Sequence, residues 1–144
     1  MKLPEYVSAA EVKKACKELK ISDWTKIKEP KVSIKEAKII LKQIDTKGMK
    51  IDPEQFRIGL EVELEHGTMF KEANITNNHP VLTGKIVLAH FKESLDYYRR
   101  LEVAELEGDM LKATVSGNMA KLKNYYKRIA KAKIRLAEAE GRQL

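Results

Sequence analysis

The chain has 144 residues, of which 43% are hydrophobic and 34% are charged, and its formal net charge is +7. This length fits one folded domain, and the composition excludes a chain that is disordered throughout. No run of about 18 apolar residues occurs, and the N-terminal segment lacks an apolar core of signal-peptide length, which predicts a soluble intracellular protein without a membrane span.

Charge is distributed unevenly along the sequence. Residues 1–51 hold 13 basic and 7 acidic residues (+6), residues 52–116 hold 7 and 12 (−5), and residues 117–144 hold 8 and 2 (+6). Such alternation can pair a chain with itself, with a second copy or with nucleic acid.

Two capping boxes predict the first two helices. Ser8 with Glu11 opens a helix of about 8–20, and Ser33 with Glu36 opens a second one. The expected inner face of the second helix is Ala37, Ile40, Leu41 and Ile44.

Two residues of this region have predicted structural roles. Cys16 is the only cysteine, which excludes an internal disulfide, and its apolar neighbours at helical spacing predict a buried thiol. Trp24 lies between Ile21 and Ile27 and is expected to anchor a turn on the core.

A third helix begins at Asp52, because Pro53 fits the first helical position after an N-cap. The apolar residues of 56–66 alternate with polar ones as in a strand, and some of them also repeat at helical spacing. The N-cap before them favours a helix. Gly67 is expected to end it, with His66 in the last turn, where a helix dipole favours an imidazolium.

The apolar pattern after His79 and Pro80 predicts one long amphipathic helix over 80–107, with an end or a kink at Gly108. A final helix is expected from about 119 to 140. Its predicted inward residues are Met119, Leu122, Tyr126, Ile129 and Leu136.

These elements predict an all-α fold of about five helices, a helical bundle with a long C-terminal antiparallel helix pair. We expect a helical domain over 1–116. The basic helix of 117–144 either packs on that domain or extends from it.

The strongest candidate for a chemical site is a set of histidines and glutamates. Glu63 and His66 form a Glu-x-x-His pair, and His90 and Glu93 form the reverse, each pair sharing one helix face. Di-metal helical bundles use such pairs, so a divalent metal site at Glu63, His66, His90 and Glu93 is one hypothesis.

A structural interpretation of the same residues is favoured over the metal site. In it Glu61, Glu63 and Glu65 form a solvated face, and His66 complements the helix dipole. His90 is then a hydrogen-bonded core residue, and His79 belongs to a helix N-terminus rather than to a ligand set.

The last helix carries seven Lys or Arg residues between Lys121 and Arg135, with no acid among them. Such a surface could bind nucleic acid without sequence specificity. A solvated face that balances the acidic middle is the alternative. The candidate binding residues are Lys121, Lys123, Lys127, Arg128, Lys131 and Arg135.

The segments FRIGLEVELEHG and ANITNNHPVLTGKIVLAHFKESLDYYRRLE resemble a family of uncharacterised helical domains from bacteria, archaea, phages and large DNA viruses. That family has a Gly-x-x-Val-Glu-x-Glu-His segment, then Ala-x-x-His-x-x-Glu and Asp-Tyr-Tyr-x-x-Leu. The resemblance covers residues 52–103. Its motifs fall on Gly59, Val62, Glu63, Glu65, His66, Ala89, His90, Glu93, Asp96, Tyr97, Tyr98 and Leu101. It implies that Glu63, His66, His90 and Glu93 act as a unit, and it implies no activity.

Three functions follow as hypotheses. No zinc-ligand spacing, phosphate-binding loop or nucleophile elbow occurs, which favours a non-enzymatic binding or structural module. The resemblance suggests a phage- or virus-associated protein, in the cytoplasm or in a virion, that self-associates or docks on a larger assembly without membrane contact. A carboxylate/histidine metal protein, possibly an enzyme, and a nucleic-acid binder are the alternatives.

Overall fold

The computed structural model describes residues 7–144, and its α-helices confirm the predicted all-α class. In chain order they are α1 (Ala9–Leu19), α2 (Ile34–Leu41), α3 (Pro53–Met69), α4 (Pro80–Glu93), α5 (Tyr97–Val115) and α6 (Met119–Gly141). Two short 3-10 helices, η1 (Trp24–Lys26) and η2 (Lys71–Ala73), lie between them. Residues 1–6, part of the segment for which no signal peptide is predicted, lie outside the described residues.

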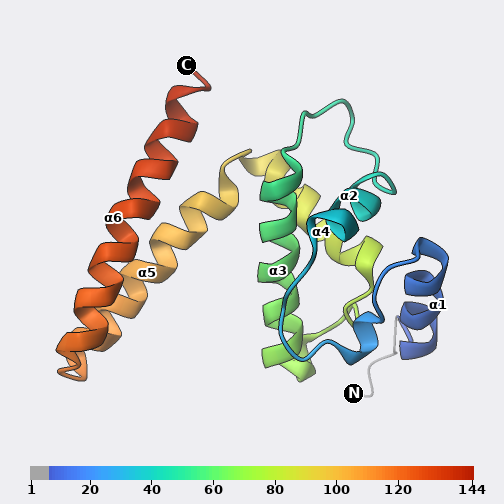
Figure 1. The fold of residues 1–144 in the computed structure, drawn as a ribbon, viewed down its shortest axis with the longest axis horizontal. Coiled ribbons are helices and arrows are strands. Elements are labelled where there is room, and N and C mark those ends of the chain that lie inside the picture. The colour runs from blue at the N-terminus through green and yellow to red at the C-terminus, as the bar shows by residue number, and fades with distance from the viewer. Residues whose placement is uncertain (1–6) are drawn as a thin grey trace, which may run out of the picture. The chain divides into compact units, whose positions relative to one another are not determined.

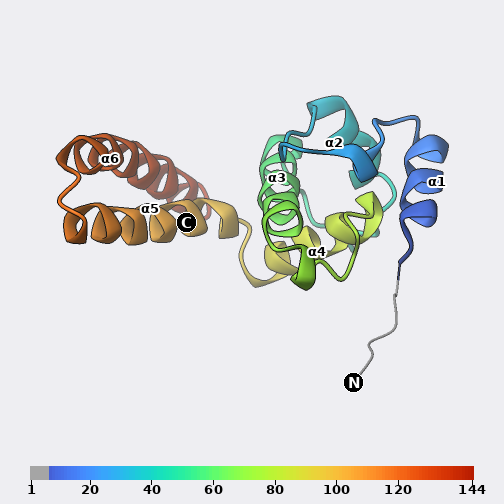
Figure 2. The same cartoon turned by 90° about the horizontal axis from the view of Figure 1, so that it is seen from below.

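The chain divides into two compact units, one ending at Lys92 and one running from Glu93 to Leu144. The first unit contains α1 to α4 (Figure 1), and the second contains α5 and α6, which run in opposite directions side by side (Figure 2). We call α5 and α6 the C-terminal hairpin. The domain boundary expected at residue 117 stays a prediction. Within the described residues, no helix is long and apolar enough to cross a membrane.

The predicted helix starts are present. Ser8 and Ser33 each cap a helix through a complete capping box, in which the serine and the glutamate three residues later bind each other's backbone N–H. The carboxylate of Asp52 accepts the N–H of Glu54 at 3.0 Å, and Pro53 is the first residue of α3. These local hydrogen bonds explain why short sequence patterns located the starts.

The core of the first unit combines residues from all four helices and η1. Trp24 is only 1% exposed, which agrees with its predicted anchoring role, and Cys16 is buried as predicted. Burial raises the pKa of the Cys16 thiol, which disfavours its reactive thiolate form. The other buried side chains include Val12, Ala37, Ile40, Phe56, Leu60, Leu64, Val87, Leu88 and Phe91.

Gly84 explains how closely α4 approaches α2 and α3. A Cβ atom at this position would lie 2.5 Å from Cδ1 of Ile44, 3.0 Å from Cγ2 of Ile40 and 3.1 Å from Cζ of Phe56. These distances are shorter than ordinary carbon contacts, so a larger residue at this position would require the neighbouring side chains or α4 to shift.

The prediction of one long helix over 80–107 is wrong, because the chain leaves the helical conformation at residues 94–96. The Ser94 hydroxyl donates to the buried carboxylate of Asp96. Arg100 donates to the same carboxylate through Nε at 2.8 Å and Nη2 at 2.9 Å. Short polar side chains compete with backbone hydrogen bonding in this way, and here they separate α4 from α5. Gly108, by contrast, neither ends nor interrupts α5.

The expected end of α3 at Gly67 is also wrong, since the helix continues to Met69. Gly67 is buried in the last turns, and a Cβ atom there would lie 2.1 Å from Oδ1 of Asn78. The glycine therefore provides space for a side chain from the following loop instead of ending the helix.

The C-terminal hairpin has a small core of its own. Leu106 of α5 packs with Ile129 and Ala132 of α6, and the partly buried Val103, Met110 and Tyr125 surround them. The predicted inward positions Met119 and Tyr126 are 69% and 66% exposed, so this part of the prediction is wrong. Tyr125, not Tyr126, lies on the face of α6 that α5 covers.

Candidate functional site

The structure brings three of the four candidate ligands together around Glu63 of α3. Its Oε1 lies 3.5 Å from Nε2 of His90 on α4, and its Oε2 lies 3.9 Å from Nδ1 of His66, one turn further along α3. The Glu63 side chain is 13% exposed, His90 is partly buried and His66 is exposed. The fourth candidate, Glu93, is exposed and is the last residue of α4.

This geometry suits a polar contact between α3 and α4. A carboxylate held between two imidazoles can pair with either ring when that ring is protonated, and it can accept a hydrogen bond from a neutral one. Among residues 7–144, no group of three or more His, Cys, Asp or Glu side chains is arranged to hold a metal ion. The metal site at Glu63, His66, His90 and Glu93 stays a prediction.

The glutamates around this cluster do not form one solvated face. Glu61 accepts the backbone N–H of Val32 at 3.0 Å and pairs with Arg57, which also bridges to Glu54 at 2.6 Å. Of Glu61, Glu63 and Glu65, only Glu65 is exposed. The spacing of Arg57 four residues before Glu61 is the sequence signal that could have indicated the ion pair.

His79 occupies the helix N-terminal position that the sequence predicts. Its Nδ1 accepts the N–H of Leu82 at 3.4 Å, and its carbonyl oxygen accepts the N–H of Thr83 at 2.9 Å. Burial lowers the pKa of His79, and the nearby Glu11 carboxylate opposes this shift. The lowered pKa favours the neutral ring, which is the form that can accept a hydrogen bond at a helix start.

Two of the six basic candidates on α6 have partners within the hairpin, and four have no salt bridge within the described part of the chain. Arg135 makes two hydrogen bonds to the Glu102 carboxylate, at 2.8 and 3.0 Å, so α5 neutralises it. Arg128 stacks over the ring of Tyr125, 5.7 Å from its centroid. The other four side chains are exposed, and no salt bridge among the described residues includes them: Lys121, Lys123, Lys127 and Lys131.

Further ion pairs join α5 to α6. Lys133 lies 3.3 Å from Glu107, and Arg100 lies 2.7 Å from Glu140. Part of the acidic charge in the middle of the sequence is therefore neutralised within the hairpin, as the charge alternation allows. Four lysines of α6, between Lys121 and Lys131, keep their positive charge without a salt bridge to a described residue.

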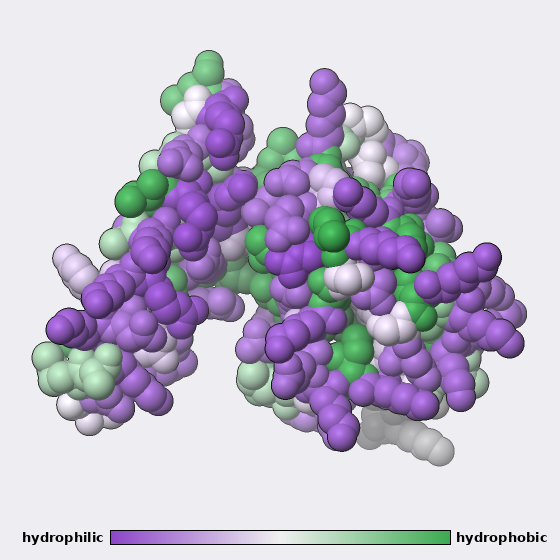
Figure 3. Space-filling model, viewed as in Figure 1, coloured by the Kyte–Doolittle hydropathy of each residue, from purple (hydrophilic) through white to green (hydrophobic). Residues whose placement is uncertain are grey.

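The sequence analysis missed a second apolar stripe on α5, because it ended one long helix near Gly108 and so divided these residues. We call it the outer seam: Tyr97, Leu101, Ala104, Gly108, Leu111 and Val115. These positions alternate in spacings of four and three residues, and at 100° per residue they lie opposite Leu106, which faces α6. Leu111 is 66% exposed and Val115 is 80% exposed. By contrast, the face of the hairpin that is visible in Figure 3, on which α6 lies, is mostly hydrophilic with a few hydrophobic residues.

Fold and site together define an all-α protein with a Glu/His cluster in its first unit and a basic helical hairpin in its second. The chain belongs to the family described as "Protein of unknown function (DUF5661)", whose model matches residues 12–107. This match confirms the predicted membership of an uncharacterised family and includes the whole Glu/His cluster. Comparisons with curated proteins and with solved structures gave no match.

Proposed function

We propose that this protein is a non-enzymatic binding module that associates with a second copy of itself through the outer seam of α5. The observation that carries the proposal is the apolar heptad spacing of this seam. Alternating steps of four and three residues are the pattern with which α-helices pack lengthwise against each other.

The hairpin uses only one of the two apolar faces of α5. Val103, Leu106 and Met110 pack toward α6, while Leu111 and Val115 on the outer seam stay exposed. A helix with apolar residues on opposite faces is typical of the interior of a larger bundle. Two hairpins joined through α5 would form a four-helix arrangement of this kind.

The seam is also compatible with two-fold symmetry. When two α5 helices are paired antiparallel about the level of Leu106, Ala104 meets Gly108 and Leu101 meets Leu111 of the second copy. A two-fold interface requires such self-complementarity, and the small residues near its centre allow a close approach of the helices. Each apolar position then has an apolar partner.

Two of the negative charges of α5 are already neutralised within the hairpin. Glu102 and Glu107 of α5 are already paired with Arg135 and Lys133 of α6. Their negative charges therefore oppose the approach of a second, equally charged α5 less than unpaired carboxylates would.

Sedimentation analysis over a range of protein concentrations tests the proposal with two matched variants. Leu111→Glu places a charge on the seam, whereas Asn124→Glu places the same charge on an exposed position of α6. We expect a concentration-dependent dimer for the wild type and for Asn124→Glu, and a monomer for Leu111→Glu. A wild-type chain that stays monomeric throughout would contradict self-association. Docking on a larger phage, viral or cytoplasmic assembly would then be the next proposal.

A second candidate function, nonspecific nucleic-acid binding, rests on the uncompensated lysines of α6. Lys123, Lys127 and Lys131 follow one outward face of α6 at four-residue spacing. The exposed ring of Tyr126 lies beside Lys123, three residues earlier on the helix, and could stack on a base. This combination of free cations and an exposed aromatic ring is typical of surfaces that track single-stranded nucleic acid.

Anisotropy of a labelled single-stranded DNA at increasing salt tests this candidate. Lys123→Gln, Lys127→Gln and Lys131→Gln together are expected to reduce the slope of log affinity against log salt by roughly 2. The matched control neutralises the exposed Lys13, Lys14 and Lys17 of α1 and should leave the slope nearly unchanged. Equal effects of both triple variants would argue against a binding surface on α6.

A further inference from the structure

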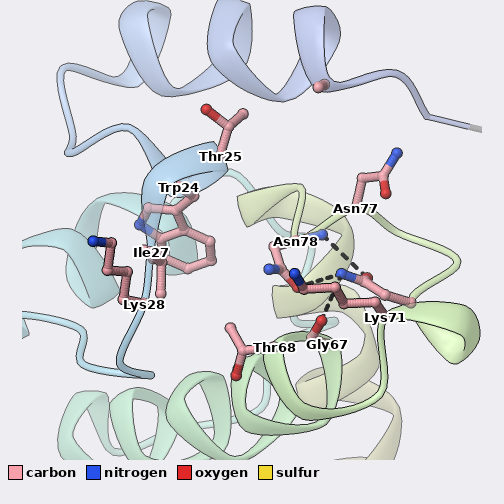
Figure 4. A pocket seen from close by; sticks show the side chains of 11 residues that line it. Trp24, Thr25, Ile27, Lys28, Gly67, Thr68, Lys71, Asn77 and Asn78 are labelled. Carbon is pink, nitrogen blue, oxygen red and sulfur yellow. Dashed lines mark hydrogen bonds between the residues drawn. The ribbon is translucent and has the colours of Figure 1, made fainter.

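The first unit contains a cavity of about 620 Å³ that neither the Glu/His cluster nor the outer seam uses. It lies where η1, the end of α3 and the loop before α4 meet (Figure 4). This volume is within the range of small-molecule sites in proteins. The residues relevant to its chemistry are Trp24, Ile27, Lys28, Lys71, Asn74 and Asn78.

One part of the wall is apolar and rigid. Trp24 is almost completely buried, and in Figure 4 the six-membered edge of its ring points toward Asn78 and Gly67. The indole N–H has no hydrogen-bond acceptor among the described residues. Native proteins keep few buried donors of this kind, and each requires a cause beyond packing. Ile27 extends the apolar surface beside the ring.

The opposite part of the wall is a set of amides held by their own hydrogen bonds. Nδ2 of Asn74 donates to the carbonyl oxygen of Gly67 at 3.1 Å and to Oδ1 of Asn78 at 3.0 Å. The N–H of Asn78 donates back to Oδ1 of Asn74 at 3.3 Å. The absence of a side chain at Gly67 leaves room for this network. The polar wall is therefore preorganised, which reduces the entropy lost when a ligand binds.

The charge of the lining has one sign. Lys28 and Lys71 are exposed at the cavity, and no Asp or Glu occurs among the described residues that line it. A lining that holds lysines and no carboxylate gives the cavity a positive potential, which favours a negatively charged ligand.

From these walls we propose that the cavity binds a small organic anion. Its phosphate or carboxylate group is attracted by the positive charge of Lys28 and Lys71 at the rim, and its apolar body contacts Ile27 and the edge of Trp24 that lines the cavity. The Nδ2 group of Asn78, which the network with Asn74 holds in place, donates to a polar atom of the ligand. The cavity belongs to the first unit and the outer seam to the second, so either proposal can fail while the other holds.

Trp24 is the only tryptophan in the sequence, so its indole N–H gives one assignable NMR signal at the cavity. We would titrate the full chain with phenyl phosphate, benzoate, inorganic phosphate and uncharged phenol. Saturable shifts of the Trp24 signal are expected with at least one of the two aromatic anions. The more effective of the two identifies phosphate or carboxylate as the preferred group. Phenol at equal concentration should give no saturable shift.

Two double variants separate a specific site from general attraction to a basic protein. Lys28→Gln combined with Lys71→Gln should lower the affinity for the aromatic anions by about tenfold or more. Lys35→Gln with Lys38→Gln neutralises two exposed lysines outside the cavity and should leave binding unchanged. The proposal is overturned if no anionic probe shifts the Trp24 signal saturably, or if both double variants weaken binding equally. Leu111→Glu should bind the probes like the wild type, so loss of self-association does not alter this test.

Discussion

At the residue scale, Glu63 distinguishes the structural interpretation of the Glu/His cluster from the metal hypothesis. Its carboxylate lies 3.5 Å from His90 and is mostly buried, whereas Glu65 on the same helix is exposed. We predict that Glu63→Gln lowers the free energy of unfolding by roughly 1 kcal/mol, because it weakens a contact between α3 and α4. Glu65→Gln should change it by less than about 0.5 kcal/mol.

The same pair of variants, melted with and without a chelator or added Zn²⁺, tests the metal hypothesis. If the cluster is structural, neither treatment changes the melting temperature of the wild type. A rise in melting temperature on addition of Zn²⁺ that disappears in Glu63→Gln but persists in Glu65→Gln would instead show that the cluster binds metal.

His79 predicts a pH dependence of stability near neutrality. Burial lowers its pKa in the folded protein below the ordinary value of 6.5, so the unfolded chain binds a proton more readily. The stabilisation is therefore present above pH 6.5 and decreases as the pH falls through the folded-state pKa. His79→Asn keeps an acceptor for the N–H of Leu82 and does not titrate. Between pH 7 and about 5.5, we expect a smaller fall in melting temperature for this variant than for the wild type. Equal falls would exclude His79 as the cause.

At the scale of elements, two helical glycines predict opposite effects of the same substitution. Alanine at Gly84 would place its Cβ atom 2.5 Å from Ile44, which follows α2, and 3.0 Å from Ile40 of α2, and should cost about 1–3 kcal/mol. Alanine at Gly108 meets nothing within 4 Å and should stabilise α5 by about 0.5–1 kcal/mol.

Urea unfolding of both variants measures these changes. The Gly108→Ala substitution should be measured in the Leu111→Glu variant, so that association through the outer seam does not contribute to the measured stability. A destabilised Gly108→Ala variant would indicate that this position is covered within a single chain. An unaffected Gly84→Ala variant would show that the core between α2 and α4 can relax.

For the molecule as a whole, the division into two units predicts that local stability can be changed separately. Ile129 lies in the core of the hairpin and Phe56 in the core of the first unit. Ile129→Ala should cost about 2–5 kcal/mol. It should increase hydrogen exchange in α5 and α6 while protection in α1 to α4 stays unchanged. Phe56→Ala should give the reverse pattern. Parallel loss of protection in both units in either variant would show one cooperative structure.

The sequence alone determined the features that depend on neighbouring residues. Ser8, Ser33 and Asp52 start helices through hydrogen bonds that close within three residues, so a short pattern is sufficient to predict them. The apolar periodicity predicted the all-α class and the burial of Ile40 and Ile129, because a helix repeats its faces regularly.

The tertiary structure decided the features that depend on residues far apart in the sequence. Gly67 follows the pattern of a helix end, yet the space needed by Asn78 gives it a different role. The contact between Glu63 and His90 depends on how α4 packs against α3, which neither helix encodes alone. Tyr125 rather than Tyr126 faces the core because α5 fixes which side of α6 is covered. Helical periodicity defines possible faces, and only packing against a partner selects the buried one.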